Sequence, residues 1–373
     1  MERKRVGVLT FHMAHNYGAM LQAYATPMVL RKLGYDGEVI NYRFPYIDQW
    51  GKGESLKDLI CKHGVVGGVL RCVKRFIYGY YSVKTARNKF LYFERQVIPH
   101  SKEYMTVEEL EKLQYESIVF GSDQIWNAEL TDGVAPVYIG DFKTKIATKK
   151  IAYAASCGKA DFSAAVKEKY LECVGKFDAV SVREAGLSEV LAKNGIKSKV
   201  VLDPTLLLTA DEWMTMVKGV PNKVRLPKNY LLVYAFDESP KFYGYVRCLA
   251  EARGLDIVVI AYKKKECMRG MNVYTNCGPA DFVNLFAHSD MVVTTSFHGT
   301  AFSIIMQKEF YCIPHPKYHE RTDSLLHLLQ LEDRGIRDYD YRKNGRKIEW
   351  DEVGKLLRDE KENSLSFLKK ELG

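Results

Sequence analysis

The stretch that decides the fold is VGVLTFHMAHNYGAMLQAYATPMVLRKLGYDGEVIN, residues 6–41. It opens with a short apolar run at residues 6–11, which predicts a buried strand, and continues through a polar loop into an amphipathic stretch at residues 19–33. Gly34 follows directly and is typical of a helix C-terminus. Residues 36–41 then predict a second strand. Strand, helix and strand in this order predict a parallel sheet with helices against its faces.

The same alternation recurs along the chain. Further strands are predicted at residues 116–120, 150–154, 179–182, 197–202, 230–235, 256–261, 291–295 and 309–312. Helices are predicted between them, and the pattern starts again after Asp203-Pro204. A charged amphipathic helix closes the chain and is expected to pack back across the preceding domains. We therefore predict an α/β protein with parallel-sheet domains at residues 1–205 and 206–349 and a C-terminal helix at residues 350–373.

Length and composition agree with a globular enzyme-sized protein. A chain of 373 residues is longer than a single hydrophobic core usually supports, so two domains are expected. No apolar run approaches the length of a membrane span. The apolar run at the N-terminus is too short for a signal peptide, so a cytoplasmic location is expected. The eight cysteines include no C-x-x-C pair, which disfavours a zinc site or a disulfide framework. The formal net charge of +9 suggests an anionic partner without naming it.

One basic segment, residues 61–96, departs from the alternation. It carries eight Lys and Arg residues against one acid, Glu94, interleaved with aromatic residues. One interpretation is peripheral contact with an anionic membrane, with Lys74, Arg75, Lys84 and Arg87 among the contacting charges. The other is a helical insertion whose aromatic side chains pack inward and whose charges are solvated.

Polar residues follow most of the predicted strands. Ligands of open parallel sheets bind beyond the carboxyl ends of the strands, so these positions are candidate site residues. They are His12, His15, Asn16, Tyr17, Ser122, Asp123, Gln124, Trp126, Asn127, Ser156, Arg183, Glu184, Ser296, Phe297 and His298. Two of these loops, at Asn16-Tyr17-Gly18 and at His298-Gly299, also open helices, whose N-termini attract anions.

Each position also has a purely structural interpretation. His298 and Asp123 could cap helices or loops, Arg183 could pair with Glu184, Trp126 could pack in the core, and Asp203-Pro204 could be a turn. The sequence has no G-x-x-x-x-G-K-[ST] loop, no G-x-G-x-x-G after a strand, no H-E-x-x-H and no G-x-S-x-G. The residues alone therefore indicate a cleft enzyme with an anionic ligand and exclude several common enzyme classes.

Six motifs in sequence resemble the polysaccharide pyruvyl transferase family. They are GVLTFHMAHNYGAMLQAYA, FGSDQIWN, IAYAASCG, SVRE, VLDPTLLL and TTSFHGTAFSIIM, and the resemblance runs from about Gly7 to Arg337. It implies a GT-B-like fold, in which two Rossmann-like domains face each other across a cleft. It also implies an enzyme of surface-polysaccharide synthesis, such as capsule or exopolysaccharide, with phosphoenolpyruvate as donor and a sugar hydroxyl pair as acceptor. The product would be a cyclic pyruvate ketal.

The resemblance assigns roles on two sides of this cleft. Arg183 matches the donor-binding arginine, His298 the catalytic histidine, and Lys317 a basic residue of the donor site, with His315 and His319 as alternatives to Lys317. The donor side is expected in the second domain and the acceptor side in the first. The donor set is Arg183, His298, Gly299, Lys317 and Arg321. The acceptor set is Asn16, Tyr17, Asp123, Gln124 and Trp126, with Asp123 also a candidate base alongside His298 and Arg183 as catalytic residues.

Two other functions compete with this assignment. A nucleotide-sugar glycosyltransferase of the same fold would place Arg183 and Lys317 on a diphosphate, but no acidic residue for a ribose diol follows a strand of the second domain. A nucleic-acid-binding protein would leave the polar strand ends unexplained, so no nucleic-acid partner is expected. Neither a metal nor a cofactor is expected, because phosphoenolpyruvate serves as substrate and no metal-ligand motif occurs. The acceptor sugar could be carried on a lipid.

Overall fold

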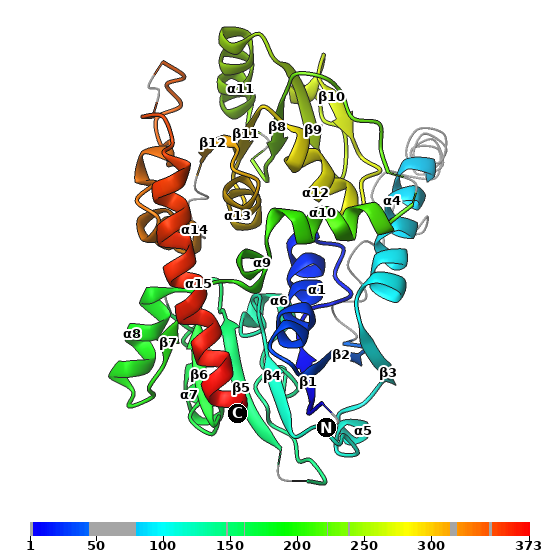
Figure 1. Ribbon diagram of the computed structural model, residues 1–373, viewed down its shortest axis with the longest axis vertical. Coiled ribbons are helices and arrows are strands. Elements are labelled where there is room, and N and C mark those ends of the chain that lie inside the picture. Colours follow the sequence, from blue (N-terminus) through cyan, green and yellow to red (C-terminus); the bar gives the residue numbers. More distant parts are fainter. Residues whose placement is uncertain are drawn as a thin grey trace, which may run out of the picture.

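The protein has two parallel-sheet domains, one above the other in Figure 1. The computed structural model describes residues 3–44, 80–146, 148–159, 161–221, 223–237, 239–313, 319–342 and 345–373. The first sheet has the order β3-β2-β1-β4-β5-β6-β7 and the second the order β10-β9-β8-β11-β12. All strand pairs in both sheets are parallel. This arrangement confirms the predicted α/β class with two parallel-sheet domains.

The strands keep close to the bounds expected from the sequence. In the first sheet they are β1 (Arg5–Leu9), β2 (Asp36–Tyr42), β3 (His100–Tyr104), β4 (Ser117–Phe120), β5 (Lys149–Ala155), β6 (Ala179–Val182) and β7 (Lys199–Val200). In the second sheet they are β8 (Tyr230–Tyr234), β9 (Asp256–Ile260), β10 (Asn272–Tyr274), β11 (Met291–Thr294) and β12 (Glu309–Cys312). Two of these, β3 and β10, are additional to the predicted strands, and β7 is shorter than predicted.

Helices cover the faces of both sheets. Those of the first domain are α1 (Tyr17–Lys32), α4 (Tyr80–Tyr92), α5 (Val107–Leu110), α6 (Ala128–Thr131), α7 (Lys167–Val174) and α8 (Ala185–Lys193), with a π-helical turn η1 (Phe93–Val97) after α4. Next come α9 (Pro204–Leu207), α10 (Ala210–Gly219), α11 (Pro240–Arg253), α12 (Pro279–His288), α13 (Phe297–Ile305), α14 (Glu320–Leu328) and α15 (Trp350–Leu372), with 3₁₀ turns η2 (Glu266–Met268) and η3 (Glu332–Arg334). Helix α1 begins at Tyr17 because the Asn16 side chain accepts a hydrogen bond from the Ala19 N–H at 3.1 Å.

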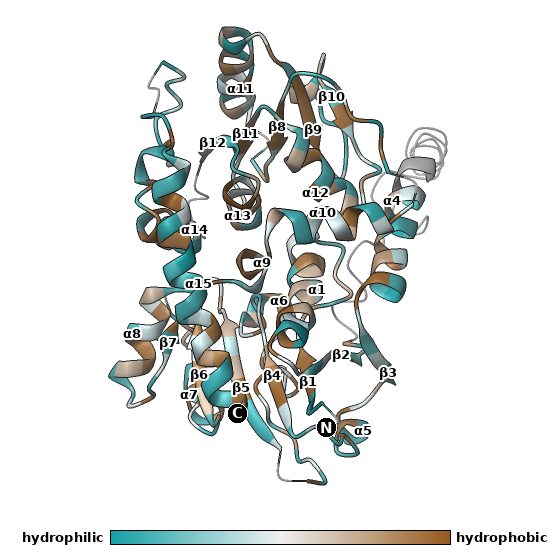
Figure 2. Ribbon diagram, in the orientation of Figure 1, coloured by the Kyte–Doolittle hydropathy of each residue, from teal (hydrophilic) through white to brown (hydrophobic). Residues whose placement is uncertain are grey.

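Both sheets reverse their strand order at one place, between β1 and β4 in the first sheet and between β8 and β11 in the second. In such sheets the loops after these strands diverge and leave a crevice for ligands. The central strands are buried throughout, as the sequences SIVF, YLLVY and MVVT of β4, β8 and β11 require, and they are hydrophobic in Figure 2. The rigid part of each domain therefore presents its strand-end loops toward the cleft.

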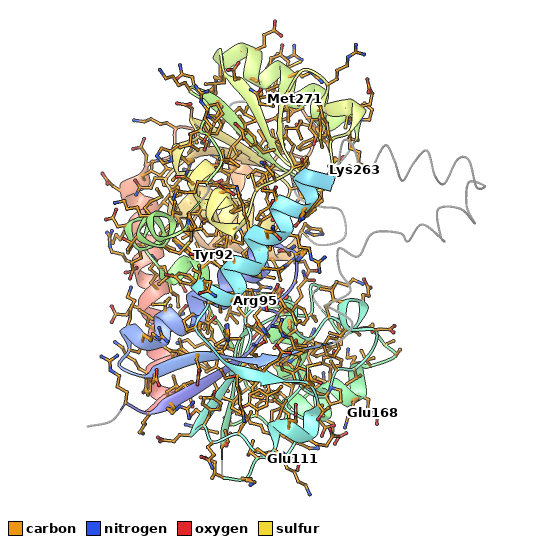
Figure 3. All side chains as sticks on the ribbon, turned by 90° about the vertical axis from the view of Figure 1, so that its right-hand side faces the viewer. Tyr92, Arg95, Glu111, Glu168, Lys263 and Met271 are labelled. Carbon is orange, nitrogen blue, oxygen red and sulfur yellow. The ribbon has the colours of Figure 1, made fainter. Side chains whose placement is uncertain are left out.

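The two domains share one continuous hydrophobic cluster rather than touching through loops alone. Helix α1 contacts α9 and α12, and α9 contacts α13 of the second domain. Helix α4 runs diagonally between the domains in Figure 3, and the Lys89 ammonium binds the buried Asp281 carboxylate at 2.7 Å. Asp281 also accepts hydrogen bonds from the Val224 and Gly278 N–H groups. This buried charge is paired from three sides, as its removal from water requires.

Most of the predicted basic segment, residues 61–79, lies outside the described residues. Its C-terminal part forms α4, in which Lys84 and Arg87 are exposed and Phe90 is buried. Among the residues that the structure describes, no helix combines the length and apolar character needed to cross a bilayer. The membrane contact of this segment therefore stays a prediction.

Helix α15 packs back on the first domain, as predicted. The Ser364 hydroxyl accepts a hydrogen bond from the Leu202 N–H at 2.9 Å, directly after β7. The Phe367 ring lies 6.3 Å from that of Tyr153 on β5, and Leu368 is buried in the cluster shared by both domains. In Figure 1 the helix descends along both domains and ends beside the first sheet. It thus covers the seam between them.

Truncation of Leu368 tests this packing. Because Leu368 is 1% exposed, Leu368→Ala should lower the free energy of unfolding by about 2–5 kcal/mol in urea titrations. The control is Lys370→Ala, whose side chain is 82% exposed and which should leave the transition midpoint in place. Equal midpoints for both variants would mean that α15 is not part of the cooperative fold.

Candidate active site

A cavity of about 300 Å³ lies where the strand ends of the two domains face each other. The first domain contributes residues after β1 and β4, and the second contributes residues after β8 and β11 together with the first turns of α13 and α14. Its lining residues are Phe11, Ala14, Asn16, Ala19, Asp123, Gln124, Asn127, Leu130, Phe236, Thr295, Ser296, Phe297, His298 and Arg321. The cavity therefore occupies the switch points of both sheets, where ligands of such folds bind.

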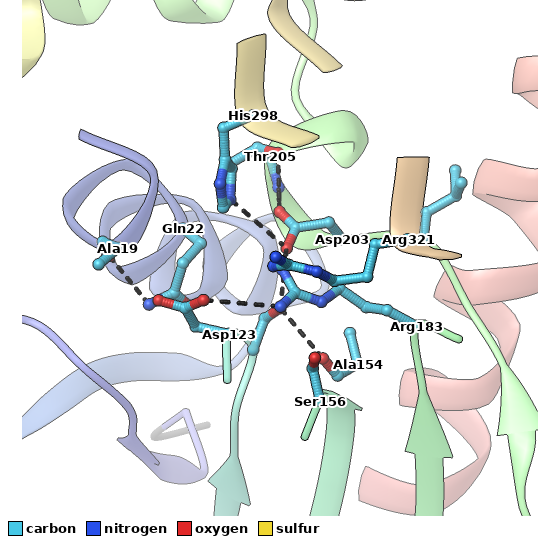
Figure 4. A network of polar contacts seen from close by, with 12 residues as sticks. Ala19, Gln22, Asp123, Ala154, Ser156, Arg183, Asp203, Thr205, His298 and Arg321 are labelled. Carbon is cyan, nitrogen blue, oxygen red and sulfur yellow. Dashed lines mark hydrogen bonds and ion pairs between the residues drawn. The ribbon is translucent and has the colours of Figure 1, made fainter. Parts of the chain in front are cut away.

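The buried Asp203 carboxylate lies at the centre of a polar network beside this cavity (Figure 4). One of its oxygens, Oδ2, accepts hydrogen bonds from Arg183 Nη1 at 2.6 Å and from the Ser122 hydroxyl at 2.8 Å. The other, Oδ1, accepts from the Thr205 N–H at 3.0 Å and hydroxyl at 2.7 Å. Burial alone would raise the pKa of Asp203, but Arg183 and the Thr205 donors lower it to about 2. Asp203 is therefore a permanent anion at neutral pH.

Two arginine side chains approach each other at one wall of the site, as Figure 4 shows. Arg321, in the first turn of α14, faces the cavity, whereas Arg183 lies behind the wall between Asp203 and Asp123. Both guanidinium groups lie over the Phe297 ring, at 5.1 Å for Arg183 and 5.7 Å for Arg321. Such stacking stabilises a cation in a desolvated position.

These arginines keep unused hydrogen-bond donors. Buried Nε and Nη2 atoms of Arg183 and the buried Nε of Arg321 have no hydrogen-bond acceptor. Burial lowers the pKa of Arg321, and the charge of Arg183 lowers it further. Asp203, Asp123 and Glu184 already lie near this pair, but buried donors without an acceptor are costly, and a ligand that accepts from Arg321 at the cavity wall would satisfy part of that need. The arrangement therefore fits an anionic ligand.

A second carboxyl group, Glu184, lies on the far side of the arginines. It accepts a hydrogen bond from the Ser156 hydroxyl, and its Oε1 lies 4.0 Å from Arg321 Nε. Burial raises the pKa of Glu184, although both arginines oppose this change. With its amide oxygen toward Arg321, Gln124 accepts hydrogen bonds from Nη1 and Nη2 at 3.2 Å. Arg321 is thus oriented from two sides.

Gly158 makes room for this Gln124 side chain. A Cβ atom at Gly158 would lie 2.2 Å from the Gln124 amide, and its φ of +80° disfavours other residues. The glycine of the IAYAASCG motif is therefore needed to place Gln124 against Arg321.

The imidazole of His298 projects into the cavity from the first turn of α13. Its Nε2 lies 3.8 Å from Asp203 Oδ2 and makes no hydrogen bond. Burial lowers the pKa of His298 to about 4, although Asp203 and Asp123 favour its protonated form. The ring is therefore neutral at pH 7 and able to accept a proton. Gly18 permits its position, because a Cβ atom there would lie 2.0 Å from His298 Nδ1.

The structure brings most of the predicted site residues together. Asn16, Asp123, Gln124, His298 and Arg321 line the cavity. Arg183 belongs to the same network but is buried and does not line the cavity. Gly299 packs closely on β11, where a Cβ atom would meet Thr294 Oγ1 at 2.1 Å, so it serves the helix–strand contact. Lys317 and His315 lie outside the described residues.

Two predicted acceptor residues, Tyr17 and Trp126, do not reach the cavity. Tyr17 is 2% exposed, donates a hydrogen bond to the Cys277 carbonyl at 3.3 Å and packs against Phe282 between the domains. Trp126 is 1% exposed and donates to the Tyr138 carbonyl at 3.1 Å. The prediction that these two rings offer an aromatic face to the sugar is therefore wrong. Each ring is buried in the core, where a large apolar surface is removed from water and the polar atom still finds a hydrogen-bond partner.

Sequence reasoning missed Asp203 and Phe236. Asp203 precedes a proline, and an Asp-Pro pair is typical of a turn. Its partner Arg183 is 20 residues away in the sequence, so only the tertiary structure brings the two side chains together. A buried-cation argument could have found it, because Arg183 needs a nearby carboxylate. Phe236 follows β8 and lines the cavity, but a single aromatic residue after a strand does not by itself indicate a site.

Within the described part of the chain, no group of three or more His, Cys, Asp or Glu side chains could hold a metal.

Fold and site together define a GT-B-like protein with a cavity lined by polar and charged side chains between two Rossmann-like domains. Solved structures agree on the fold: a putative UDP-N-acetylglucosamine 2-epimerase from Listeria monocytogenes has a TM-score of 0.52 at 11% identity, over 98% of this chain and 91% of that one. The UDP-GlcNAc 2-epimerase of Methanocaldococcus jannaschii has a TM-score of 0.52 at 10% identity, over 96% and 92%. At these identities the likeness concerns the fold alone.

The family is shown by the sequence itself. The profile of the polysaccharide pyruvyl transferase family matches residues 16–317, which include most of the cavity-lining residues from both domains. The chain belongs to this family and is a transferase. No curated protein matches the chain.

The neutral state of His298 has a consequence for stability. Its pKa is about 4 in the folded protein and about 6.5 in an unfolded chain, so the unfolded state binds more protons between these values. The free energy of unfolding should therefore fall as the pH drops from 6.5 to 4, by about 3 kcal/mol from this group. His298→Gln removes the group, and its stability should fall less over this interval in urea titrations. Parallel pH profiles for the two proteins would contradict a neutral buried His298.

Proposed function

We propose that this enzyme transfers the pyruvyl group of phosphoenolpyruvate to two hydroxyl groups of one sugar, forming a cyclic ketal and releasing phosphate. The observation that carries the proposal is Arg321 at the cavity wall beside the neutral His298, with Arg183 behind it and both guanidinium groups over the Phe297 ring. Family membership supports the pyruvyl donor and the polysaccharide acceptor.

The donor fits the cationic wall of the cavity. Phosphoenolpyruvate carries a phosphate and a carboxylate, and arginine forks bind both groups well. Arg321 faces the cavity and would bind one of them directly. The Ser296–His298 turn adds the N-terminus of α13, where Ser296 makes no side-chain cap and the backbone dipole favours an anion. Arg321 and the N-terminus of α13 would therefore stabilise the negative charge of the departing phosphate.

The reaction requires two proton transfers. The first hydroxyl attacks C2 while C3 gains a proton, and the second hydroxyl attacks C2 as the C2–O bond to phosphate breaks. One hydroxyl proton thus ends on C3 and the other on the departing phosphate. His298 is neutral and can take the proton of an attacking hydroxyl. Asp123, on the cavity wall 3.5 Å from Arg183, would orient the acceptor or act as an alternative base.

Phosphate release tests the donor and the roles of these residues. With phosphoenolpyruvate and a panel of nucleotide-linked and lipid-linked sugars, release should depend on one class of sugar. His298→Ala should reduce it by at least about 100-fold, the range for loss of a proton-transfer group. Arg321→Ala should abolish the thermal stabilisation by phosphoenolpyruvate, because the direct anion contact is lost. His327→Ala, at an 84% exposed side chain, is the control and should behave as wild type.

The runner-up function is a nucleotide-sugar glycosyltransferase, which this fold also supports. Thermal stabilisation by a nucleotide sugar, without any by phosphoenolpyruvate, would favour it and would overturn the pyruvyl donor.

We expect enzymatic activity to persist in EDTA, since the proposed steps use only side chains and substrate.

A location in the cytoplasm, with contact to the inner membrane surface through the basic segment, completes the proposal. Flotation with anionic liposomes should weaken when Lys84 and Arg87 are neutralised together with Lys74 and Arg75.

A further inference from the structure

Phe236 is a large apolar side chain left half exposed inside the cavity. It follows β8 directly, lines the cavity and has an exposed fraction of 50%. The other aromatic lining residues, Phe11 and Phe297, are 4% and 8% exposed. The face of Phe297 is also occupied by the two arginines. Among the described lining residues, Phe236 is therefore the aromatic ring with substantial surface to offer a ligand.

The backbone and one edge of the ring are in contact with neighbouring residues. The Phe236 N–H donates to Thr295 Oγ1 at 2.8 Å, which joins the ends of β8 and β11. Its ring packs edge-on against Tyr234 at 5.4 Å, and Tyr234 packs edge-on against Phe282 at 5.0 Å. Tyr17 closes the same aromatic column between the domains. These contacts restrict the ring on one edge and leave the other part of its surface open to a ligand.

The first domain supplies four polar side chains to the cavity, beside the apolar Phe11, Ala14, Ala19 and Leu130. Asn16, Asp123, Gln124 and Asn127 come from the strand ends of the first domain, whereas Phe236 comes from the second. A ligand between them meets an aromatic face on one side and amide and carboxylate groups on the other. A pyranose ring has this character, because axial C–H groups make one face apolar and hydroxyl groups surround its edge. Phosphoenolpyruvate has no such face, and its charged groups belong at Arg321 and His298.

We propose that Phe236 is the platform on which the acceptor sugar ring packs, with its hydroxyl edge toward Asn16, Asp123, Gln124 and Asn127. The proposal rests on the proposed function for the identity of the acceptor. It replaces the predicted contribution of Tyr17 and Trp126, whose rings are buried in the core. It also places the sugar between the four polar side chains of the first domain and Phe236, so that its hydroxyl edge faces the side on which Asp123 lies.

Four variants separate ring stacking from mere apolar contact. Phe236→Ala removes the ring, Phe236→Leu keeps apolar volume without an aromatic face, and Phe236→Tyr restores the face. Tyr341→Ala removes an exposed aromatic ring elsewhere, with an exposed fraction of 37%, and serves as the control. The alanine and leucine variants should raise the KM for the acceptor about tenfold, and the tyrosine variant should match wild type. The KM for phosphoenolpyruvate should not change in any of them.

A binding measurement separates this proposal from the proposed function. Saturation-transfer NMR with methyl hexopyranosides, without phosphoenolpyruvate, should show C–H protons of one sugar in contact with wild type and with Phe236→Tyr only. Sugar binding of this pattern without phosphate release from phosphoenolpyruvate would overturn the pyruvyl donor and leave the platform standing. The platform is overturned if Phe236→Leu binds like wild type, if no sugar distinguishes the variants, or if the change falls on phosphoenolpyruvate instead.

Discussion

The buried carboxylate of Asp203 is the constraint on which the site depends. Its four hydrogen bonds join Ser122 after β4, Arg183 after β6 and Thr205 in α9, while His298 of the second domain lies 3.8 Å away. A buried charge is tolerated only when its partners are close and well oriented, so these positions cannot shift independently. The chain segment that links the two domains thereby also sets the position of the arginine and the histidine.

The same carboxylate shapes the charge of the site. It accepts a hydrogen bond from Nη1 of Arg183, whereas Nη2 lies 3.5 Å from Asp123 Oδ1 and Nε makes no hydrogen bond. It also favours protonation of His298, but burial outweighs this effect and the imidazole stays neutral. An anion bound at Arg321 would, by its charge, raise the proton affinity of the imidazole. Donor binding and preparation of the proton acceptor are therefore linked through one cluster of charges.

The sequence was sufficient for the fold because buried parallel strands are continuous apolar runs, as in β4, β8 and β11. The two additional strands were not predicted, for different reasons. Strand β3, with the sequence HSKEY, is polar, and strand β10 has only three residues. Both lie at the edges of their sheets, where half-solvated backbone tolerates such sequences. The polar strand ends likewise predicted Asn16, Asp123, Gln124 and His298 at the cavity, since parallel strands deliver their carboxyl ends to one edge.

What the sequence could not supply was the direction in which each side chain points. Tyr17 and Trp126 stand in the same loops as cavity residues, yet their rings face the core, and Phe236 takes the exposed position instead. Arg183 matches a donor-site motif but lies behind Arg321, which belongs to the other domain. The two arginines thus come from different domains, Arg183 from the first and Arg321 from the second, and the division into a donor domain and an acceptor domain stays a prediction. Because the proposed anion site needs residues of both domains, the aromatic contacts of Tyr17 and the ion pair of Lys89 with Asp281, which join the domains, would support binding without touching the ligand.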